Sequence, residues 1–379
     1  MKHTILVIGL MYGDCGKGKI VHALAKATKC DLIARFNGGA NAGHTIELDS
    51  GEKLVYKQLP SGSGIPGVRA VIANGSVIDL MKLKSELEGQ QAAVMLSTDA
   101  HVVTPEHILR DELQEGQREP GNKIGTTLSG NGPAYSDKAT RCGLTVGQLS
   151  SEGRVNDKYD ASAHMLDESP IQLIHSQEYL RRCQKYETGV MILEGAHGWE
   201  LDIDHGDYPF VTSSSCGIGG AAIGTGLNPR SIDEVIGVVK AYSTRVGEGD
   251  FPYKMISRDR LHIRASHPEI GTNTKRMRRV DWMDAGRIRK ACAANGVDQI
   301  ALTHLDVLTG LSRVQILAQN NKTVSIPGWT ENLGECIQYS DLPINAQTFV
   351  KTLEDFTGVR VGLISVGPKE SQLIWKYVE

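Results

Sequence analysis

A glycine-rich turn near the beginning of the chain constrains its fold more than any other feature. The turn, Gly13-Asp14-Cys15-Gly16-Lys17-Gly18-Lys19, follows the apolar run at 4–9 and precedes a second run at 20–25. A buried strand, a glycine-rich turn and a helix start together bind phosphates, because backbone N–H groups and the positive helix end point at the anion. The sequence therefore predicts an α/β fold with a phosphate-binding loop.

This loop differs from the common nucleotide-binding pattern G-x-x-x-x-G-K-[ST]. Gly16 and Lys17 fit the pattern, but Met11 stands in place of the first glycine and Gly18 in place of the magnesium-binding Ser or Thr. In addition, Asp14 lies inside the loop, where the reacting phosphate would lie. The loop alone therefore leaves the kind of nucleotide chemistry open.

Composition excludes several classes of protein. The 379 residues carry a net charge of -3, which argues against a general nucleic-acid or membrane-surface binder. No apolar run approaches the roughly 20 residues of a membrane span, and the chain enters a strand directly after Met1, so we expect no signal peptide. The seven cysteines form no C-x-x-C pair and are interpreted as reduced thiols, Cys15 among them as a space-filling residue. We expect a cytoplasmic protein.

Short apolar runs, most of them rich in β-branched residues, alternate with helical patterns along the chain. The expected strands are Ile5–Ile8, Leu32–Arg35, Ala70–Ala73, Val190–Leu193, Glu234–Val239, Gln299–Thr303 and Val361–Ser365. The expected helices are Lys17–Thr28, Leu80–Glu88, Ile171–Tyr186 and Trp282–Ala294, and Ser150–Ser169 is the expected insertion. These patterns predict one α/β domain over residues 1–379. Its central, mostly parallel sheet is expected to resemble that of P-loop NTPases, flanked by helices and with loop and helical elaborations.

Polar phrases, many of them rich in glycine, follow several of these strands and predict that one site holds several anions. Three residues suit a second phosphate (Thr127, Thr212, Arg141), and three suit carboxylates because arginine is a fork-shaped carboxylate binder (Thr274, Arg276, Arg278). Asp306 has the position of an aspartate that accepts hydrogen bonds from guanine. Alternative interpretations are a turn cap for Asp306, a solvated charge run for the arginines, and structural roles for His44 and His197.

Taken in order, the phrases are similar to those of adenylosuccinate synthetases from Ile5 to Pro368. The family phrases W-G-D-E-G-K-G-K, N-A-G-H-T, G-T-T…G-P-A-Y-x-D-K, E-G-A-Q-G, K-A-Y-x-T-R-V-G, T-G-R-R-R-R and S-x-G-P all have counterparts. The resemblance implies a ligase of purine biosynthesis that joins L-aspartate to carbon 6 of IMP, with GTP and Mg²⁺. It also implies a homodimer in which Arg141 acts on the partner's site, and no nucleic-acid or membrane partner.

The resemblance further implies a role for each matching residue. Asp14 would be the general base, His44 the general acid, and Lys17 would offset charge on the transferred phosphate. The phosphate donor would contact Gly13, Cys15, Gly16, Lys17, Gly18, Lys19, Gly43, His44, Thr45, His304, Asp306, Ser365, Gly367 and Pro368. The purine monophosphate would contact Asp14, Asn41, Thr127, Arg141, His197, Thr212 and Val246. Aspartate would contact Thr274, Arg276 and Arg278, and Mg²⁺ would contact Asp14 and the backbone oxygen of Gly43.

Several residues depart from the family phrases, mainly at contacts to the bases. Cys15 replaces a glutamate, His197 a glutamine that faces the purine, and His304 a lysine of the guanine phrase. These changes keep a second interpretation open, in which a phage-type enzyme in the host cytoplasm joins aspartate to GMP or dGMP with GTP, ATP or dATP. The retention of Asp14 favours IMP. A guanine-nucleotide switch and a nucleotide kinase are further alternatives from other classes.

Overall fold

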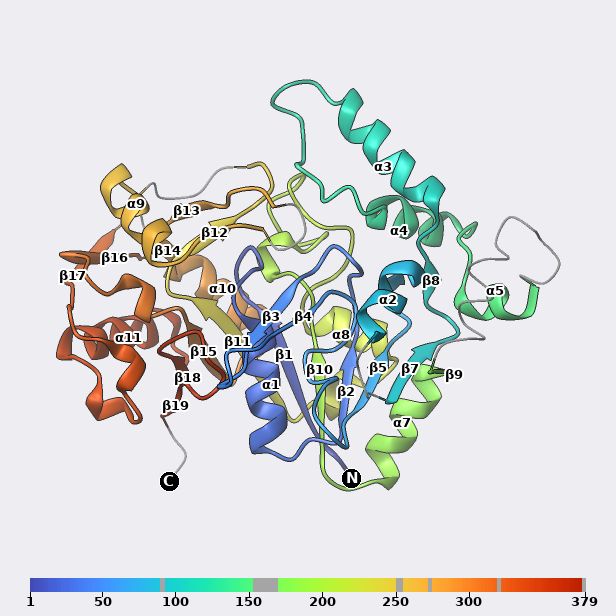
Figure 1. The fold of residues 1–379 in the computed structure, drawn as a ribbon, viewed down its shortest axis with the longest axis horizontal. Helices are drawn as coiled ribbons and strands as arrows, with labels where there is room; N and C mark the ends of the chain where they lie inside the picture. Colours follow the sequence, from blue (N-terminus) through green and yellow to red (C-terminus); the bar gives the residue numbers. More distant parts are fainter. Residues whose placement is uncertain (89–92, 153–169, 250–254, 272–274, 319–321, 377–379) are drawn as a thin grey trace.

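A computed structural model of the chain describes residues 1–88, 93–152, 170–249, 255–271, 275–318 and 322–376. A ten-stranded sheet forms its centre (Figure 1). In spatial order its strands are β19 (Leu373–Trp375), β18 (Val361–Ser365), β15 (Gln299–Thr303), β11 (Glu234–Lys240), β1 (His3–Gly9), β10 (Val190–Glu194), β2 (Leu32–Arg35), β5 (Arg69–Ile72), β7 (Ala93–Ser97) and β9 (Ile171–Ile174). Only the pairing of β18 with β19 is antiparallel. The predicted α/β class with a mostly parallel sheet is confirmed.

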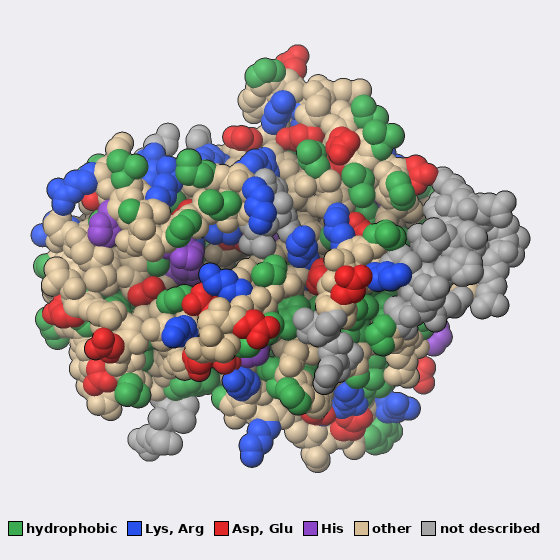
Figure 2. Space-filling model, in the orientation of Figure 1, with side chains coloured by type: hydrophobic (Ala, Val, Ile, Leu, Met, Phe, Trp, Pro, Cys, Tyr) green, Lys and Arg blue, Asp and Glu red, His purple; other side chains and the backbone are tan. Residues whose placement is uncertain are grey.

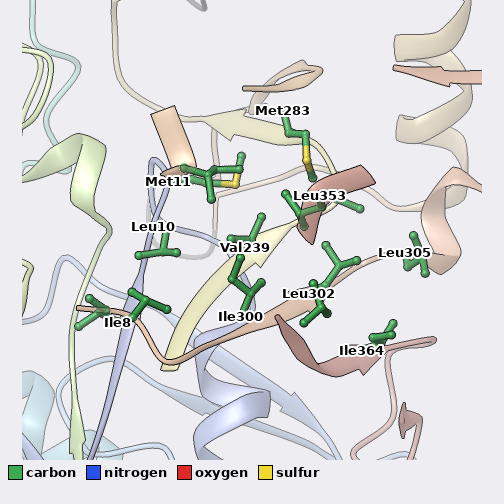
Figure 3. Packing of buried hydrophobic residues seen from close by; sticks show 14 of the residues in the cluster. Ile8, Leu10, Met11, Val239, Met283, Ile300, Leu302, Leu305, Leu353 and Ile364 are labelled. Carbon is green, nitrogen blue, oxygen red and sulfur yellow. The ribbon is translucent and has the colours of Figure 1, made fainter. Parts of the chain in front are cut away.

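Side chains of β1 alternate between two apolar cores, because successive residues of a strand point to opposite faces. Leu6 and Ile8 pack in a core with residues of α10 (Ala285–Asn295) and α11 (Ile344–Thr357). Figure 3 shows Ile8 and Leu10 of this core near Val239 and Ile300. Ile5 and Val7 pack instead with residues of α1 (Lys17–Ala27). Burial on both faces explains why β1 reads as a continuous apolar run.

Further elements surround this sheet. The other helices are α2 (Leu80–Leu87), α3 (Pro105–Gln117), α4 (Asn131–Thr140), α5 (Val146–Glu152), α7 (Ser176–Tyr186), α8 (Ile218–Thr225) and α9 (Ser257–Ser266). Short 3₁₀ helices are η2 (Trp199–Leu201), η3 (Pro229–Ser231), η4 (Asp306–Leu308), η6 (Leu333–Glu335) and η7 (Tyr339–Asp341). Three two-stranded sheets pair β3 (His44–Glu47) with β4 (Lys53–Tyr56), β6 (Val77–Ile78) with β8 (His101–Val102), and β12 (Ser243–Arg245) with β13 (Arg279–Asp281). A three-stranded sheet has the order β14 (Met283–Asp284), β16 (Arg313–Leu317) and β17 (Thr323–Pro327). In Figure 1, α3 and α4 stand together beyond one end of the central strands.

All seven expected strands are present to within about two residues at each end. Two expected helices begin too early. The segment 171–174 is β9, which pairs with β7, and Met283–Asp284 is β14, which pairs with β16. In both cases a strand partner takes the backbone hydrogen bonds that a first helical turn would have used. Most of the expected insertion at 150–169 lies outside the described residues, and the single-domain assignment stays a prediction.

Candidate active site

The carboxyl ends of the parallel strands open into one cavity of about 710 Å³. Loops after β1, β2, β10, β11, β15 and β18 line it, as expected for ligand sites of open α/β sheets. Figure 2 shows a hollow in this face, with Lys and Arg side chains around it. The sequence predicted site residues on each of these loops, and the fold brings most of them together.

The glycine-rich loop takes left-handed backbone conformations at three positions before α1 begins. Gly13 has φ 78°, Asp14 φ 47° and Gly16 φ 77°. Gly16 is also the residue at the helix start, so the backbone N–H groups of the first turn of α1 are available to an anion. A non-glycine residue with positive φ is uncommon, and aspartate is one of the residues that tolerate it. Asp14 is therefore held in a strained conformation on the cavity wall.

The structure explains why Gly18 stands where a Ser or Thr is usual. A Cβ atom at Gly18 would lie only 2.8 Å from the Cβ of His44. The loop that carries His44 thus takes the space that a magnesium-binding hydroxyl would need. The missing Ser or Thr is a consequence of placing a histidine against the phosphate-binding loop.

Two lysines tie this loop to distant segments. The Lys17 ammonium donates to the backbone oxygen of His197 and lies 3.7 Å from the Cys15 sulfur. Lys19 donates to Ser365 Oγ at 2.8 Å and to Gly367 O at 2.7 Å. Burial lowers the pKa of Lys19 to about 8. Lys19 therefore joins the glycine-rich loop to the segment that contains Ser365 and Gly367, which is also predicted to bind the phosphate donor.

His44 lies in a buried polar cluster with a carboxylate that the sequence reasoning left without a role. Its Nδ1 is 2.5 Å from Glu194 Oε1, and Ser61 donates to both carboxylate oxygens at 2.5 and 2.7 Å. Burial alone would raise the pKa of Glu194, but His44, Arg35 and Ser61 hold it at about 2. Burial lowers the pKa of His44, and Glu194 opposes that shift. Glu194 is therefore an ionised partner that fixes the orientation of His44.

Asp14 faces one of the predicted aspartate-binding residues. Arg278 Nε donates to Asp14 Oδ2 at 2.7 Å, and Arg278 Nη1 donates to Glu269 Oε2 at 2.9 Å. Thr274 lies outside the described residues. Arg276 is half-buried and donates to the backbone oxygens of Gly125 and Thr126 at 2.6 and 2.9 Å. This side chain thus ties the predicted aspartate loop to a predicted phosphate loop.

Six of the seven residues predicted for the monophosphate lie on the wall of this cavity: Asp14, Asn41, Thr127, His197, Thr212 and Val246. Asn41 Oδ1 accepts from Asn131 Nδ2 at 2.8 Å, and the Thr127 and Ser129 hydroxyls are hydrogen bonded to each other. Arg141 ends α4 with φ 65°, is exposed and does not line the cavity. The action of Arg141 on a partner's site stays a prediction.

Two histidines replace the family's residues at strand ends and take left-handed conformations. His197 has φ 59° and His304 φ 58°. Burial, assisted by Lys17, lowers the pKa of His197 to about 3, and its buried Nδ1 has no hydrogen-bond partner within the described residues. Burial and Lys240 also lower the pKa of His304, whose Nδ1 lies 3.0 Å from Thr303 Oγ1. Both imidazoles are therefore neutral at pH 7.

The predicted phosphate-donor residues line the same cavity, from the first loop to Asp306, Ser365, Gly367 and Pro368. Cys15 differs from the others, because its side chain is fully buried in the core with Val7 and Ile20. Its interpretation as a space-filling residue agrees with this packing. Asp306 lies on the wall, and burial raises its pKa.

The donor set around Asp14 fits a magnesium ion that is shared with substrate phosphates. Within the residues described, no cluster of three or more His, Cys, Asp or Glu side chains could hold a metal. Mg²⁺ commonly binds to one or two carboxylates together with phosphates and water, rather than in a closed protein site. Asp14 and Gly43 both line the cavity, and their role as magnesium ligands stays a prediction.

Comparison with known proteins agrees with this geometry. The family model described as adenylosuccinate synthetase matches residues 6–187, 168–323 and 317–374. The adenylosuccinate synthetase of Desulforudis audaxviator is 38% identical over 98% of this chain and 97% of its own length. That of Mycobacterium leprae is 35% identical over 98% and 97%.

Two solved structures show the same fold. The fully ligated adenylosuccinate synthetase of Plasmodium falciparum has a TM-score of 0.91 and 30% identity, over 98% of this chain and 99% of that one. The succinoaminodeoxyadenylate synthetase of cyanophage S-2L, bound to dGMP and dATP, has a TM-score of 0.74 and 23% identity, over 100% and 96%. No described helix is both long and apolar enough to cross a membrane. The chain belongs to the adenylosuccinate synthetase family and is a ligase that forms a carbon–nitrogen bond.

Proposed function

We propose that this chain joins L-aspartate to carbon 6 of IMP, with GTP as the phosphate donor and adenylosuccinate, GDP and phosphate as products. The observation that carries the proposal is the single cavity that brings Asp14, His44 and Arg278 together, in a chain with full-length similarity to adenylosuccinate synthetases. Phosphoryl transfer and carboxylate recognition are both needed for this reaction, and the cavity offers residues for each.

The first step activates the purine. O6 of the purine lactam is a poor nucleophile, and removal of the N1 proton by the Asp14 carboxylate places negative charge on O6. O6 then attacks the γ-phosphorus, the bond to the β-γ bridging oxygen breaks, and GDP leaves. Lys17 and His44 stabilise the charge that develops on the transferred phosphoryl group. Mg²⁺, held by Asp14 and Gly43, would supply further charge stabilisation.

The second step forms the carbon–nitrogen bond. The amine of aspartate attacks carbon 6, and the 6-phosphoryl group leaves as phosphate. Thr274, Arg276 and Arg278 are proposed to bind the carboxylates of aspartate, because arginine binds carboxylates through two parallel hydrogen bonds. Arg278 already pairs with a carboxylate in the structure, that of Asp14.

The remaining predicted residues are proposed to bind the two nucleotides. Asn41, Thr127 and Thr212 would hold the 5′-phosphate, with Val246 at the ribose and His197 at the purine. Thr45, His304, Asp306, Ser365, Gly367 and Pro368 would complete the GTP site. Arg141 is proposed to reach the 5′-phosphate in the partner subunit of a homodimer, so a forced monomer should bind IMP weakly. Tight binding of IMP by such a monomer would exclude that role.

A second acceptor, GMP or dGMP, is favoured by one observation. His197 is neutral, its Nδ1 has no hydrogen-bond partner among the described residues, and it replaces the family's glutamine at the purine. An imidazole presents one donor and one acceptor on a rigid ring, whereas a glutamine amide presents two donors and a carbonyl. The set of hydrogen bonds offered to the purine is therefore different in this chain.

The test is a matrix of IMP, GMP, dIMP and dGMP against GTP, ATP and dATP, with aspartate, read by product mass. The proposal expects adenylosuccinate from IMP and GTP at the highest kcat/KM. A 2-amino product formed faster from GMP or dGMP would favour the second acceptor. GTP hydrolysis without monophosphate and aspartate would point to a switch, and a nucleoside diphosphate made without aspartate would point to a kinase.

A further inference from the structure

The cavity wall beside Asp14 is supported by a buried carboxylate to which the proposed reaction gives no role. Glu269 accepts hydrogen bonds from Lys240 Nζ at 2.6 Å, Tyr242 OH at 2.5 Å and Arg278 Nη1 at 2.9 Å. Its side chain is fully buried. A buried carboxylate with three donors from two distant segments is held in one position, because any rotation would leave a buried charge without partners.

Charges alternate in sign along this network. Asp14 pairs with Arg278, Arg278 with Glu269, and Glu269 with Lys240. Lys240 ends the central strand β11 and also lies 4.5 Å from the ring centre of Tyr242. Lys240 and Tyr242 thus attach Glu269 to the rigid sheet, and the donors that they provide hold the pKa of Glu269 well below its usual range despite burial.

Backbone pairing places Glu269 and Arg278 at the base of one hairpin. The Arg278 N–H donates to Glu269 O at 2.8 Å, and the Gly271 N–H donates to Arg276 O at 2.8 Å. The two segments therefore run antiparallel, and the second of them carries Arg276, which is proposed to bind aspartate. The backbone hydrogen bond between Arg278 and Glu269 fixes this second segment beside Glu269.

Arg278 has donors left over after both pairings. A guanidinium carries five N–H groups, and the ion pairs with Asp14 and Glu269 use Nε and Nη1 only. Nη2 makes no hydrogen bond to a described residue, and Arg278 lines the cavity. The Nη2 amino group, with its two N–H groups, thus remains for a substrate carboxylate, while Glu269 holds the guanidinium through Nη1.

We propose that Glu269 is a positioning residue for aspartate: anchored by Lys240 and Tyr242, it fixes the Arg278 guanidinium between Asp14 and the bound substrate carboxylate. This inference rests on the proposed function. Without Glu269, Arg278 can turn toward Asp14 alone, and the substrate carboxylate then loses an oriented partner. The main effect falls on aspartate binding rather than on the nucleotides.

The experiment measures kcat and the KM of each substrate for wild type, Glu269→Gln, Arg278→Lys and the double variant. For Glu269→Gln we expect the aspartate KM to rise about tenfold, the scale of one lost charged hydrogen bond, with the KM values of IMP and GTP within about twofold. Glu269→Asp, which keeps the charge, should recover part of the loss. Glu86→Gln is the matched control, since Glu86 is a carboxylate that accepts backbone N–H groups of residues 57–59 away from this network.

The double variant separates positioning from a general structural role. If Glu269 acts through Arg278, the two effects on aspartate KM are not additive, and the double variant resembles Arg278→Lys. Additive effects, an unchanged aspartate KM in Glu269→Gln, or equal rises in all three KM values would overturn the positioning role. A wild-type chain that does not ligate aspartate to any monophosphate would instead overturn the proposed function, and the positioning role with it.

Discussion

The amino ends and the carboxyl ends of the central strands, here called the amino edge and the carboxyl edge of the sheet, both carry ion pairs. The amino-edge pairs are partly exposed, whereas those around Glu269 are buried. At the amino edge, Lys2 donates to both oxygens of Asp31 at 2.5 and 2.7 Å, and Arg69 Nη2 lies 2.6 Å from both Asp31 and Glu187. We call Lys2, Asp31, Arg69 and Glu187 the amino-edge cluster. These residues lie at or just before the starts of β1, β2, β5 and β10. None of the four has a positive φ.

At the carboxyl edge, the network of Asp14, Arg278, Glu269 and Lys240 keeps hydrogen-bond donors on Arg278 Nη2 that no described residue accepts. Asp14, His197 and His304 line the cavity with positive φ angles, and the buried Nδ1 of His197 has no partner within the described chain. Strain and unsatisfied polar groups persist only where the surroundings enforce them, and they are common where ligands bind. The difference indicates that the amino edge stabilises the fold, while the carboxyl edge is organised for substrates.

The largest effect should come from breaking a pair at the carboxyl edge. Asp14→Asn should lower kcat about 10³-fold, since it removes the proposed base, and asparagine tolerates the left-handed backbone at this position. The melting temperature should change little. The matched variant at the other edge is Asp31→Asn, which also removes a carboxylate paired with arginine. If Asp31→Asn lowers kcat as much as Asp14→Asn does, the division between the two edges is wrong.

The next effect should come from breaking the amino-edge cluster. Arg69→Met leaves two partly exposed carboxylates without their shared guanidinium and should lower the free energy of unfolding by about 1.5 kcal/mol. Urea denaturation measures it, and kcat of the folded enzyme should stay within about twofold of wild type. Lys351→Met breaks the exposed pair with Asp355 and should cost only about 0.4 kcal/mol. A loss for Arg69→Met no larger than that control would contradict the stabilising role.

A smaller effect concerns the pH dependence of the amino-edge cluster. The hydrogen bond from Arg69 lowers the pKa of Glu187 from 4.5 to about 2. A carboxylate whose pKa is lowered by folding contributes stability above its unfolded pKa, and that contribution is lost as the pH falls through its folded pKa. Between pH 4.5 and pH 2 the urea midpoint of wild type should therefore fall more steeply than that of Glu187→Gln. Parallel curves for the two proteins over this window would show that Glu187 does not contribute.

Much of the central sheet and many residues of the candidate site could be predicted from the sequence, because local patterns specify local structure. The apolar runs predicted the strands of the central sheet, and the glycine-rich turn predicted the loop at Gly13–Lys19. The site residues that precede or follow strands were found because parallel strands end at one edge. Glu194 and Glu269 received no role from the sequence, because each acts through partners far along the chain. Glu194 meets His44 and Ser61, and no local pattern records such contacts.

Predicted helix starts failed for a related reason. A run such as 171–186 has helical spacing, and only the pairing of β9 with β7 turns its first four residues into a strand. The charge pairs of the amino edge were also absent from the sequence interpretation. Asp31, Arg69 and Glu187 are ordinary surface residue types, and it is the parallel order of β2, β5 and β10 that brings them together.

The smallest effect should come from Cys15, one of the departures from the family phrases that keep the second acceptor open. Its side chain is fully buried, and a Cβ atom at Gly9 would lie 3.0 Å from its sulfur, so little space surrounds it. Cys15→Ala should cost about 1 kcal/mol of stability and leave the kcat/KM ratios for IMP over dGMP and for GTP over ATP unchanged. His197→Gln should change the first ratio, because that side chain lines the cavity. A Cys15→Ala variant that shifts either ratio would show that the packing behind the loop, and not only the residues facing the cavity, selects the substrate.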